Sequence, residues 1–272
     1  MTIKRLLVHV DNAKACPERV RVAGEVARHF DAELIGAYVN RPFSYGYGDA
    51  AVFTPELIRH IEGEKKQLCD AAERCFNEVL VGSEFPTAWT IIGDSLTIGL
   101  SNAGRAMDLV VIGQHDPDDP YACPFGDIGE LCVSAGRPLL VTPYINAPAK
   151  LATNIMLAWN GGREAARAAA DALPFFQLAD RVDVVRVAGR KSDPHDDRII
   201  EYLNSHGINA ELHHHANGGI DIGDQLLSSA ASLSATMLVM GAYGHSRARE
   251  FVLGGATRTI LSSMTVPVLL SH

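Results

Sequence analysis

At Met237–Thr257 the sequence reads MLVMGAYGHSRAREFVLGGAT. Four apolar residues, typical of a buried strand, lead into Gly241, and a polar segment then continues to the run Gly254–Thr257, where a helical pattern begins. Because glycine has no Cβ, Gly241 allows a sharp turn or the close approach of a ligand. The run Gly254–Thr257 offers free backbone N–H groups at a helix N-terminus, where anions such as phosphate bind. The stretch therefore predicts a strand, an anion-binding loop and a helix start.

The same pattern occurs earlier in the chain, so the sequence contains two copies of one unit. Gly113 and Gly126 are thirteen residues apart, as are Gly241 and Gly254. Around them, short apolar runs alternate with segments of helical periodicity, which predicts the order βαβαβαβαβ in each half. Strands are expected at 3–10, 33–39, 87–92, 108–113, 138–142, 154–159, 182–187, 210–215 and 236–241 and in the last residues. Helices are expected at 17–30, 54–80, after Asp94, from about 127, at 164–173, 194–206 and 221–233, and after Gly254.

Strands that alternate with helices predict parallel sheets with right-handed crossovers and helices on both faces. We therefore expect an α/β chain of two tandem, doubly wound, five-stranded parallel sheets of the Rossmann-like type, with domains at 1–145 and 152–272. Pro138 and Pro267 open the last strand of each half, where a missing N–H is tolerated. Since exposed edge strands tend to pair, these two strands are expected to pair with each other, in an intramolecular pseudo-dimer, or with another protomer.

Composition excludes several classes of partner. The net charge of −8 and the pI near 5.7 argue against binding to nucleic acid or to an anionic membrane, which both require a basic surface. No apolar run approaches the roughly 18 residues of a membrane span, and Asp11 comes too early for a signal peptide. A cytoplasmic protein is expected.

The cysteines indicate no stabilising framework. All five lie in the first half, their number is odd, and none forms a CxxC pair. Reduced, buried thiols are therefore expected in place of disulfides or structural zinc.

The glycine spacing resembles a motif of the universal stress protein family. Gly241, two residues, Gly244, nine residues and Gly254 match the nucleotide-binding subgroup, in which Ser or Thr follows the last glycine. Here Gly255 follows, and Thr257 offers a hydroxyl two residues later. Both halves share the family's element order and its proline-containing last strand, so the whole chain resembles a tandem universal stress protein. The resemblance implies an adenine nucleotide alpha hydrolase-like variety of the Rossmann-like fold.

The resemblance also implies a site for ATP, with or without Mg²⁺, in the second half. In that family an acidic residue after the first strand meets the adenine, the end of the second strand lines the base, and the glycine loop surrounds ribose and phosphates. Asn160 replaces the usual aspartate, and its amide offers both a donor and an acceptor. With two loop cations as phosphate ligands, the implied residues are Asn160, Val187, Met240, Gly241, Gly244, His245, Arg247, Gly254, Gly255, Ala256 and Thr257.

The first half departs further from the motif. It keeps Asp11, but Asp116 stands at the position of the second glycine, and Asp118, Asp119 and Asp127 add negative charge nearby. Because like charges repel the phosphates of a nucleotide, the first half is expected to bind ATP poorly or not at all.

Sequence patterns of enzymes are missing. There is no GxxxxGK[ST] motif and no lysine after Lys191, whereas phosphoryl transfer needs such charge-neutralising groups. The chain also lacks a GxSxG elbow, a Cys with an identifiable His partner, and GxGxxG after the first strand. No catalytic residue is assigned, and slow ATP hydrolysis is the most that is expected.

The histidine run at 213–215 is a candidate metal site. Only His213 and His215 share one face of a strand, and two histidines without an assigned carboxylate or thiol make a weak site, so no metal site is assigned. The leading prediction is an adenine-nucleotide-binding stress-response protein that acts as a sensor or adaptor for an unknown protein partner, with a homodimer through edge strands. The alternative is a nucleotide-independent interaction module of the same fold.

Overall fold

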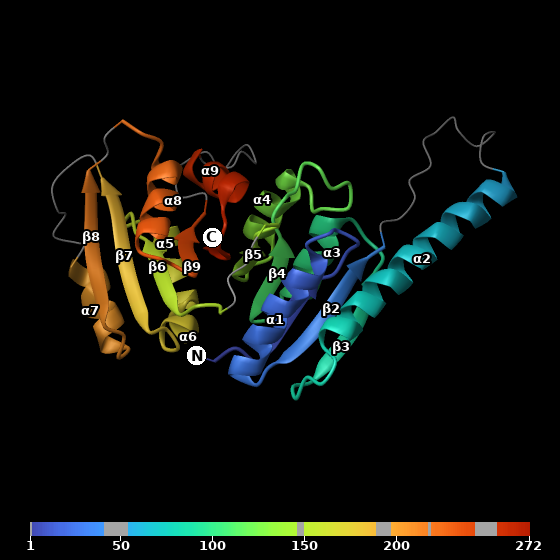
Figure 1. The fold of residues 1–272 in the computed structure, drawn as a ribbon, viewed down its shortest axis with the longest axis horizontal. Coiled ribbons are helices and arrows are strands. Elements are labelled where there is room, and N and C mark those ends of the chain that lie inside the picture. Colours follow the sequence, from blue (N-terminus) through green and yellow to red (C-terminus); the bar gives the residue numbers. More distant parts are fainter. Residues whose placement is uncertain (1, 41–53, 146–149, 189–196, 217–218, 243–254) are drawn as a thin grey trace.

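The computed structural model describes residues 2–40, 54–145, 150–188, 197–216, 219–242 and 255–272 (Figure 1). The first half contains β1 (Arg5–His9), α1 (Cys16–Phe30), β2 (Glu33–Val39), α2 (Pro55–Val79), β3 (Thr87–Ile92), α3 (Leu96–Gly104), β4 (Leu109–Gly113), α4 (Phe125–Ser134) and β5 (Leu139–Thr142). The second half contains β6 (Asn154–Ala158), α5 (Arg163–Asp171), α6 (Leu173–Phe176), β7 (Arg181–Ala188), α7 (Asp197–Ser205), β8 (Ala210–Ala216), α8 (Ile222–Ser232), β9 (Met237–Gly241), α9 (Gly255–Ser263) and β10 (Val268–Ser271). The predicted alternation of strands and helices is confirmed.

The two halves share one sheet. Its strand order is β3-β2-β1-β4-β5-β10-β9-β6-β7-β8, and all pairs are parallel except the central antiparallel pair of β5 with β10. The expected pairing of the two last strands with each other is therefore confirmed, and it makes an intramolecular pseudo-dimer. These strands lie in the middle of the sheet, so a homodimer through sheet edges would have to use β3 or β8.

The strands β5 and β10 pair in the register expected for a local two-fold axis between the halves. Leu140 and Leu269 are the second residues of β5 and β10, and they face each other across the ladder. Pro138 and Pro267 directly precede these strands, so their missing N–H groups interrupt no ladder within them, although their carbonyls accept hydrogen bonds from β4 and β9. The symmetry places equivalent helices of the two halves on the same face of the sheet.

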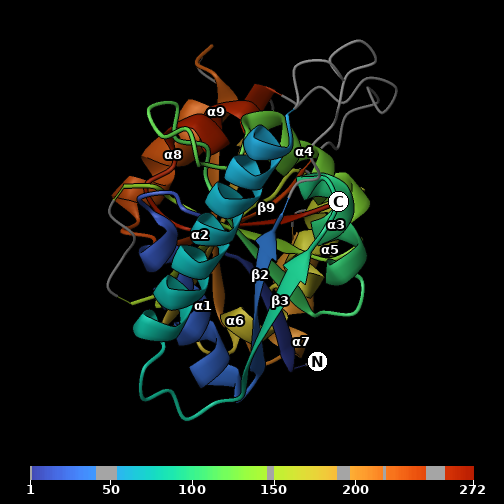
Figure 2. The same ribbon diagram turned by 90° about the vertical axis from the view of Figure 1, so that its right-hand side faces the viewer.

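Two apolar cores run along the sheet, one on each face. One core contains buried residues of α1, α2, α5, α6 and α7, and the other contains buried residues of α3, α4, α8 and α9. Figure 2 shows helices of the first half on both sides of its strands. Leu140 and Leu269 belong to the first core, and their neighbours in β5 and β10 belong to the second, so both cores cross the junction between the halves.

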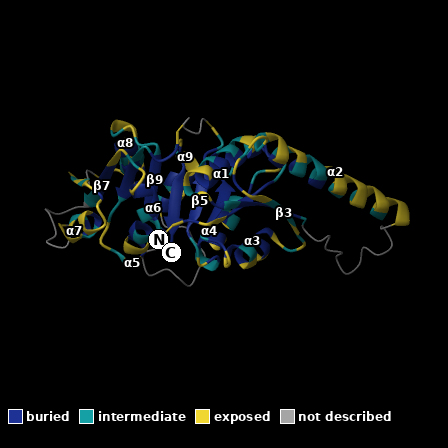
Figure 3. Ribbon diagram, turned by 90° about the horizontal axis from the view of Figure 1, so that it is seen from below, coloured by how far each residue is buried: buried dark blue, intermediate teal, exposed yellow. Residues whose placement is uncertain are grey.

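Helix α2 is held by few contacts for its length. It spans 25 residues, begins at the predicted cap, where Thr54 Oγ1 accepts from Leu57 N at 3.2 Å, and buries only Cys69, Ala72 and Phe76. Its N-terminal part is largely exposed and projects away from the sheet (Figure 3). None of the described helices is both long and apolar enough to cross a membrane.

Some element boundaries differ from the sequence predictions. Ser95 caps α3, where Asp94 was expected; its Oγ accepts from Ile98 N at 3.4 Å, while Asp94 bonds the amide of Ser95. Helix α4 begins two residues before the predicted Asp127. A separate short helix, α6, follows α5, and it contains Pro174, whose missing N–H interrupts the helical ladder.

The central pairing can be tested by truncating one of its buried leucines. Leu140 has no exposed surface, so Leu140→Ala removes packed methyl groups and is expected to lower the free energy of unfolding by about 3 kcal/mol. Ile91→Ala is the control, because Ile91 lies on the edge strand β3 and is 54% exposed, and it should lower the free energy by less than about 1 kcal/mol. Urea denaturation measures both; equal losses would show that the central pair is not a well-packed core.

Candidate functional site

In the second half, successive strands are added on one side of β6 (β7, β8) and then on the other (β9, β10), so the direction of winding reverses at β6. Ala158, the last residue of β6, pairs with Met240 of β9 on one side and with Val185 of β7 on the other. In sheets of this kind the ligand crevice lies beyond the carboxyl ends of the strands at such a reversal. The candidate site is therefore the carboxyl edge of β6, β7 and β9.

The structure places the described members of the predicted site along this edge. Asn160 follows β6 and is exposed, Val187 lies near the end of β7, and Met240 and Gly241 end β9. Helix α9 begins at Gly255, as the glycine run predicted, with Ala256 and Thr257 in its first turn. The remaining predicted residues lie outside the described part of the chain: Gly244, His245, Arg247 and Gly254.

Gly241 is explained by packing within the protein. A Cβ at this position would lie 2.4 Å from the backbone carbon of Glu164 and 2.5 Å from the nitrogen of Ala165, both in α5. Helix α5 comes this close because its buried face consists mainly of alanines, Ala165, Ala168 and Ala169. The space beside Gly241 is thus filled by a helix backbone and is not left for a ligand, in contrast to one of the two sequence interpretations.

Asn160 presents hydrogen-bond donors. Its Oδ1 accepts the backbone N–H of Gly162 at 2.8 Å, across the left-handed residue Gly161, whose φ is 74°. This turn assigns the amide orientation, since an N–H group requires the oxygen as its acceptor. Within the described residues the Nδ2 group of Asn160 has no hydrogen-bond partner, so a ligand with an acceptor atom suits it.

The N-terminus of α9 lies near a carboxylate. Among the described residues, the atom nearest to a Cβ on Gly255 would be Oδ2 of Asp221, at 4.0 Å. Asp221 caps α8, and its Oδ1 accepts from Gly223 N at 2.8 Å and from Asp224 N at 3.3 Å, so amides of α8 hold its charge. Thr257 is only 4% exposed, so its hydroxyl is less accessible than the resemblance implied.

The corresponding edge of the first half is filled by an arginine that the sequence analysis missed. The side chain of Arg19 in α1 is 2% exposed and bonds Asp11 Oδ1 through Nη2 at 2.6 Å. Its Nη1 lies where a Cβ of Gly113 would be, so the guanidinium rests directly on the end of β4. The signal was present in the sequence, since Arg19 interrupts the apolar face formed by Cys16, Val20 and Ala23.

The charges of this buried pair depend on each other. Burial alone would raise the pKa of Asp11, but the charges of Arg19 and His9 and a hydrogen bond from Ala13 N bring it below its usual value. For Arg19, burial opposes the charge, and the carboxylate of Asp11 raises the pKa of the guanidinium above its usual value. Loss of either partner would leave a buried, unpaired charge.

A loop of the first half also closes over this edge. Asp119 is 6% exposed; its Oδ2 accepts from the backbone of Lys14 at 2.7 Å, and its Oδ1 accepts from Tyr121 N at 3.0 Å. Asp116 Oδ1 accepts from Asp118 N at 3.0 Å. Asp116 and Asp119 thus stabilise the loop after β4 through backbone contacts, in addition to adding negative charge.

The structure supplies a carboxylate to the histidine run. Asp183 of β7 is buried; its Oδ1 is 2.8 Å from His213 Nε2, and Glu211 lies close enough to share an ion with both. Sequence reasoning could not pair Asp183 with His213, because the register of β7 and β8 brings them together. Asp183 is also bonded by Arg181 at 2.7 and 3.0 Å, which satisfies its charge without a metal.

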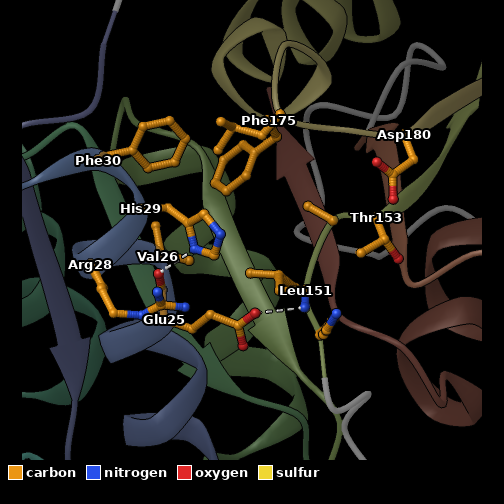
Figure 4. Close-up of a pocket in the computed structure, with 12 residues that line it drawn as sticks. Glu25, Val26, Arg28, His29, Phe30, Leu151, Thr153, Phe175 and Asp180 are labelled. Atoms are coloured by element: carbon orange, nitrogen blue, oxygen red, sulfur yellow. Dashed lines mark hydrogen bonds between the residues drawn. The ribbon is translucent and has the colours of Figure 1, made fainter.

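A cavity of about 280 Å³ lies elsewhere, between α1 and the start of the second half (Figure 4). Phe30 and Phe175 meet edge to face at its apolar end, with ring centroids 5.4 Å apart. Glu25 Oε1 accepts from Leu151 N at 2.9 Å. None of the described nucleotide-site residues lines this cavity, which is therefore a feature of the junction and not of the switch point.

No protein-family model matches the sequence, and no curated protein matches it. Solved structures do match. A universal stress protein from Archaeoglobus fulgidus DSM 4304 is 15% identical with a TM-score of 0.71, over 99% of this chain and 96% of that one. A putative universal stress protein from Pseudomonas aeruginosa UCBPP-PA14 is 18% identical with a TM-score of 0.58, over 99% and 93%. A functionally unknown protein from Pseudomonas aeruginosa PAO1 is 17% identical with a TM-score of 0.57, over 99% and 92%. This chain has the tandem universal stress protein fold.

The structural role of Gly241 predicts a large effect of a single methyl group. Gly241→Ala places a Cβ against the backbone of α5, which cannot rotate away as a side chain would, so the free energy of unfolding should fall by about 2 kcal/mol or more. Gly255→Ala adds the same methyl group at a helix start, where the nearest described atom is 4.0 Å away, and should change the free energy of unfolding by less than about 1 kcal/mol. Thermal or urea unfolding compares the two, and equal stability would place the α5 backbone further away.

The buried ion pair of Arg19 with Asp11 predicts that loss of Arg19 lowers the free energy of unfolding more than loss of an exposed arginine does. Arg19→Met leaves the carboxylate of Asp11 buried without its cation, and the free energy of unfolding should fall by about 3 kcal/mol at neutral pH. Arg21→Met, on the same helix, breaks pairs with Glu18 and Glu25 around a guanidinium that is 37% exposed, and should change the free energy of unfolding by less than about 1 kcal/mol. Similar losses in urea denaturation would contradict the buried pairing.

Proposed function

We propose that this chain is a universal stress protein that binds ATP or a related adenine nucleotide in its second half and acts as a sensor or adaptor in a stress response. The carrying observation is that three features suited to a nucleotide follow the carboxyl ends of the strands at the switch point. These are the donor side of Asn160 after β6, the ends of β7 and β9, and the N-terminus of α9, which follows β9 and the glycine-spaced sequence.

The proposed base contact uses the amide of Asn160. Its Oδ1 is engaged by Gly162, so the Nδ2 donors would bond a ring nitrogen of adenine, which is an acceptor. An aspartate at this position could not donate. Val187, partly buried near the end of β7, would supply an apolar contact to the base.

The proposed phosphate contacts use backbone amides and loop cations. Gly255 and Ala256 begin α9, where N–H groups lack partners within the helix and the helix dipole favours an anion. Gly254, His245 and Arg247 are assigned to the same phosphates from the sequence motif alone. A Cβ at Gly255 would meet no described atom within 4.0 Å except Oδ2 of Asp221, whereas the space at Gly241 is filled by α5, so Gly241 is proposed as a packing residue of the site.

The carboxylate of Asp221 suggests a place for a cation. It lies near the start of α9, where it would repel a phosphate unless a counter-ion came between them. Mg²⁺ bound to phosphates takes one or two carboxylates among its oxygen ligands, so a Mg²⁺–ATP complex suits this edge better than free ATP.

Binding without efficient hydrolysis follows from the charges available. The second half has no lysine after Lys191, and no metal-binding acidic pair accompanies the loop motif in the sequence. Such groups neutralise charge that develops during phosphoryl transfer. The site would hold a nucleotide and convert its presence into a change of loop conformation or partner binding.

The first half is proposed to bind no nucleotide. The guanidinium of Arg19 rests on the end of β4, and the loop carrying Asp119 is bonded to Lys14 N, so the edge is occupied by the protein itself. This physical obstacle adds to the acidic character inferred from the sequence.

Matched glycine variants test the nucleotide site. ATP with Mg²⁺ at 100 times its dissociation constant should stabilise the wild-type protein by about 2.7 kcal/mol in thermal unfolding. Gly254→Val should abolish this shift because a branched side chain blocks the phosphate amides. Gly126→Val changes the glycine at the equivalent position of the first half, where a Cβ meets no described atom within 4 Å, and should leave the shift intact.

The same experiment distinguishes the alternative function. A wild-type protein that shows no shift with ATP and Mg²⁺, and that carries no nucleotide after purification, would be a nucleotide-independent interaction module of this fold. Loss of the shift in both glycine variants would place the nucleotide elsewhere.

A further inference from the structure

Two carboxylates and an imidazole meet on one face of β7 and β8. Asp183 of β7 lies directly opposite Glu211 of β8, and His213 follows Glu211 on the same face of that strand. Asp183 Oδ1 is 2.8 Å from His213 Nε2, and one ligand atom from each of the three side chains lies within 4.8 Å of the other two. Carboxylate oxygen and imidazole nitrogen are ligands of divalent transition-metal ions.

The members of this cluster differ from those that the histidine run suggested. The sequence paired His213 with His215, because both lie on one face of the strand. In the structure His215 Nδ1 is 3.3 Å from Ser229 Oγ of α8, and it is not one of the three clustered residues. The carboxylates that the sequence left unassigned come from β7 and from β8 itself.

The buried carboxylate of Asp183 needs a positive charge or hydrogen-bond donors beside it. Its side chain is 2% exposed, and Arg181 donates to it from Nε at 2.7 Å and from Nη2 at 3.0 Å. The side chain of Arg181 is 45% exposed, so it can rotate into water at a small cost. A metal dication in its place would balance the charges of both Asp183 and Glu211, whereas one guanidinium balances only one of them.

The contact between Asp183 and His213 has the geometry from which a metal site can form. An ionised carboxylate only accepts hydrogen bonds, so His213 Nε2 carries the hydrogen that lies between the two groups. A metal ion on Nε2 takes the place of that hydrogen, and the imidazole stays neutral with its proton on Nδ1. Neighbouring ligand atoms of tetrahedral zinc are about 3.3 Å apart, so Oδ1 and Nε2 need to separate by about 0.5 Å. Glu211 is exposed, and its side chain can rotate to complete the third side.

We propose that Asp183, Glu211 and His213 bind one divalent transition-metal ion of the zinc type, with water as the fourth ligand. The imidazole favours zinc over Mg²⁺ and Ca²⁺, which prefer oxygen ligands. The ion replaces Arg181 as the partner of Asp183 and links β8, at one end of the sheet, to β7.

The metal site is separate from the proposed nucleotide site. Asp183 precedes Val187 of β7 by four residues, which corresponds to about 13 Å along a strand. Zinc binding and nucleotide binding can therefore be measured independently, and failure of one leaves the other untouched.

Calorimetric titration of the full-length protein with zinc chloride tests the proposal. The protein is first treated with a chelator, which is then removed, and magnesium chloride serves as the comparison. The wild type should bind one equivalent of zinc at this site and bind Mg²⁺ at least about 100-fold more weakly. Cobalt(II) in place of zinc should give the visible absorption of a tetrahedral site without a sulfur-to-metal charge-transfer band, which excludes the five cysteines as its ligands.

Three amide variants locate the bound ion. Asp183→Asn and Glu211→Gln keep the size of each side chain but remove its charge, and each should weaken zinc binding at least about tenfold. His214→Gln is the matched control, because His214 is the next residue after His213 and its side chain alternates to the other face of β8. This variant should change the affinity by less than about twofold, since it removes no ligand.

Arg181→Gln distinguishes a metal site from a cluster with a structural role alone. The variant removes the cation that competes with zinc for Asp183, so zinc should bind about fivefold more tightly, in line with the loss of an exposed ion pair. A cluster whose only role is to hold β7 and β8 together would gain no affinity for zinc from this change.

The wild-type protein can overturn the proposal without any variant. Failure to bind zinc would do so, as would a cobalt spectrum with a thiolate band and no other site. Should Asp183→Asn not fold, Glu211→Gln decides, because its side chain is exposed. Zinc binding that Glu211→Gln leaves at wild-type affinity and stoichiometry would place the ion elsewhere and overturn the assignment.

Discussion

The antiparallel pairing of β5 with β10 is the interaction on which the rest of the structure depends. A parallel sheet of five strands would leave its last strand as an open edge, with unpaired backbone groups on a buried element. Here each half satisfies the last strand of the other, and Leu140 and Leu269 meet at the local two-fold axis. Because both apolar cores continue across this pair, the halves are joined by backbone hydrogen bonds and by side-chain packing at once.

The two halves of the sheet are related by symmetry, but the space at their switch points is filled in different ways. In the first half a side chain, Arg19, fills the space beside Gly113, and it requires the buried carboxylate of Asp11 as its partner. In the second half alanines let the backbone of α5 approach Gly241, and no buried cation is needed. The difference between the two edges therefore follows from the helix that packs on each. Helix α1 places one charged side chain there and fills the edge of the first half. Helix α5 places alanines there, and the edge of the second half presents an amide and a helix N-terminus.

The same arginine gives the first half a different electrostatic character at this edge. Its guanidinium is buried and bonds Asp11 Oδ1 at 2.6 Å, so the edge holds an internal ion pair. The equivalent edge of the second half presents the side-chain amide of Asn160 and the N-terminus of α9. The two halves of a duplicated fold therefore differ in charge and in filling at the same place.

The order of elements, the duplication and the glycine spacing could be predicted from the sequence, because periodicity and backbone requirements act over neighbouring residues. The sequence also predicted that the last strands pair, since the same apolar strand ends both copies. The contacts between distant segments could not be predicted in this way: Arg19 on Gly113, Asp183 with His213, and α5 against Gly241. These depend on helix position and strand register to within about an ångström, and close packing sets both through the whole core.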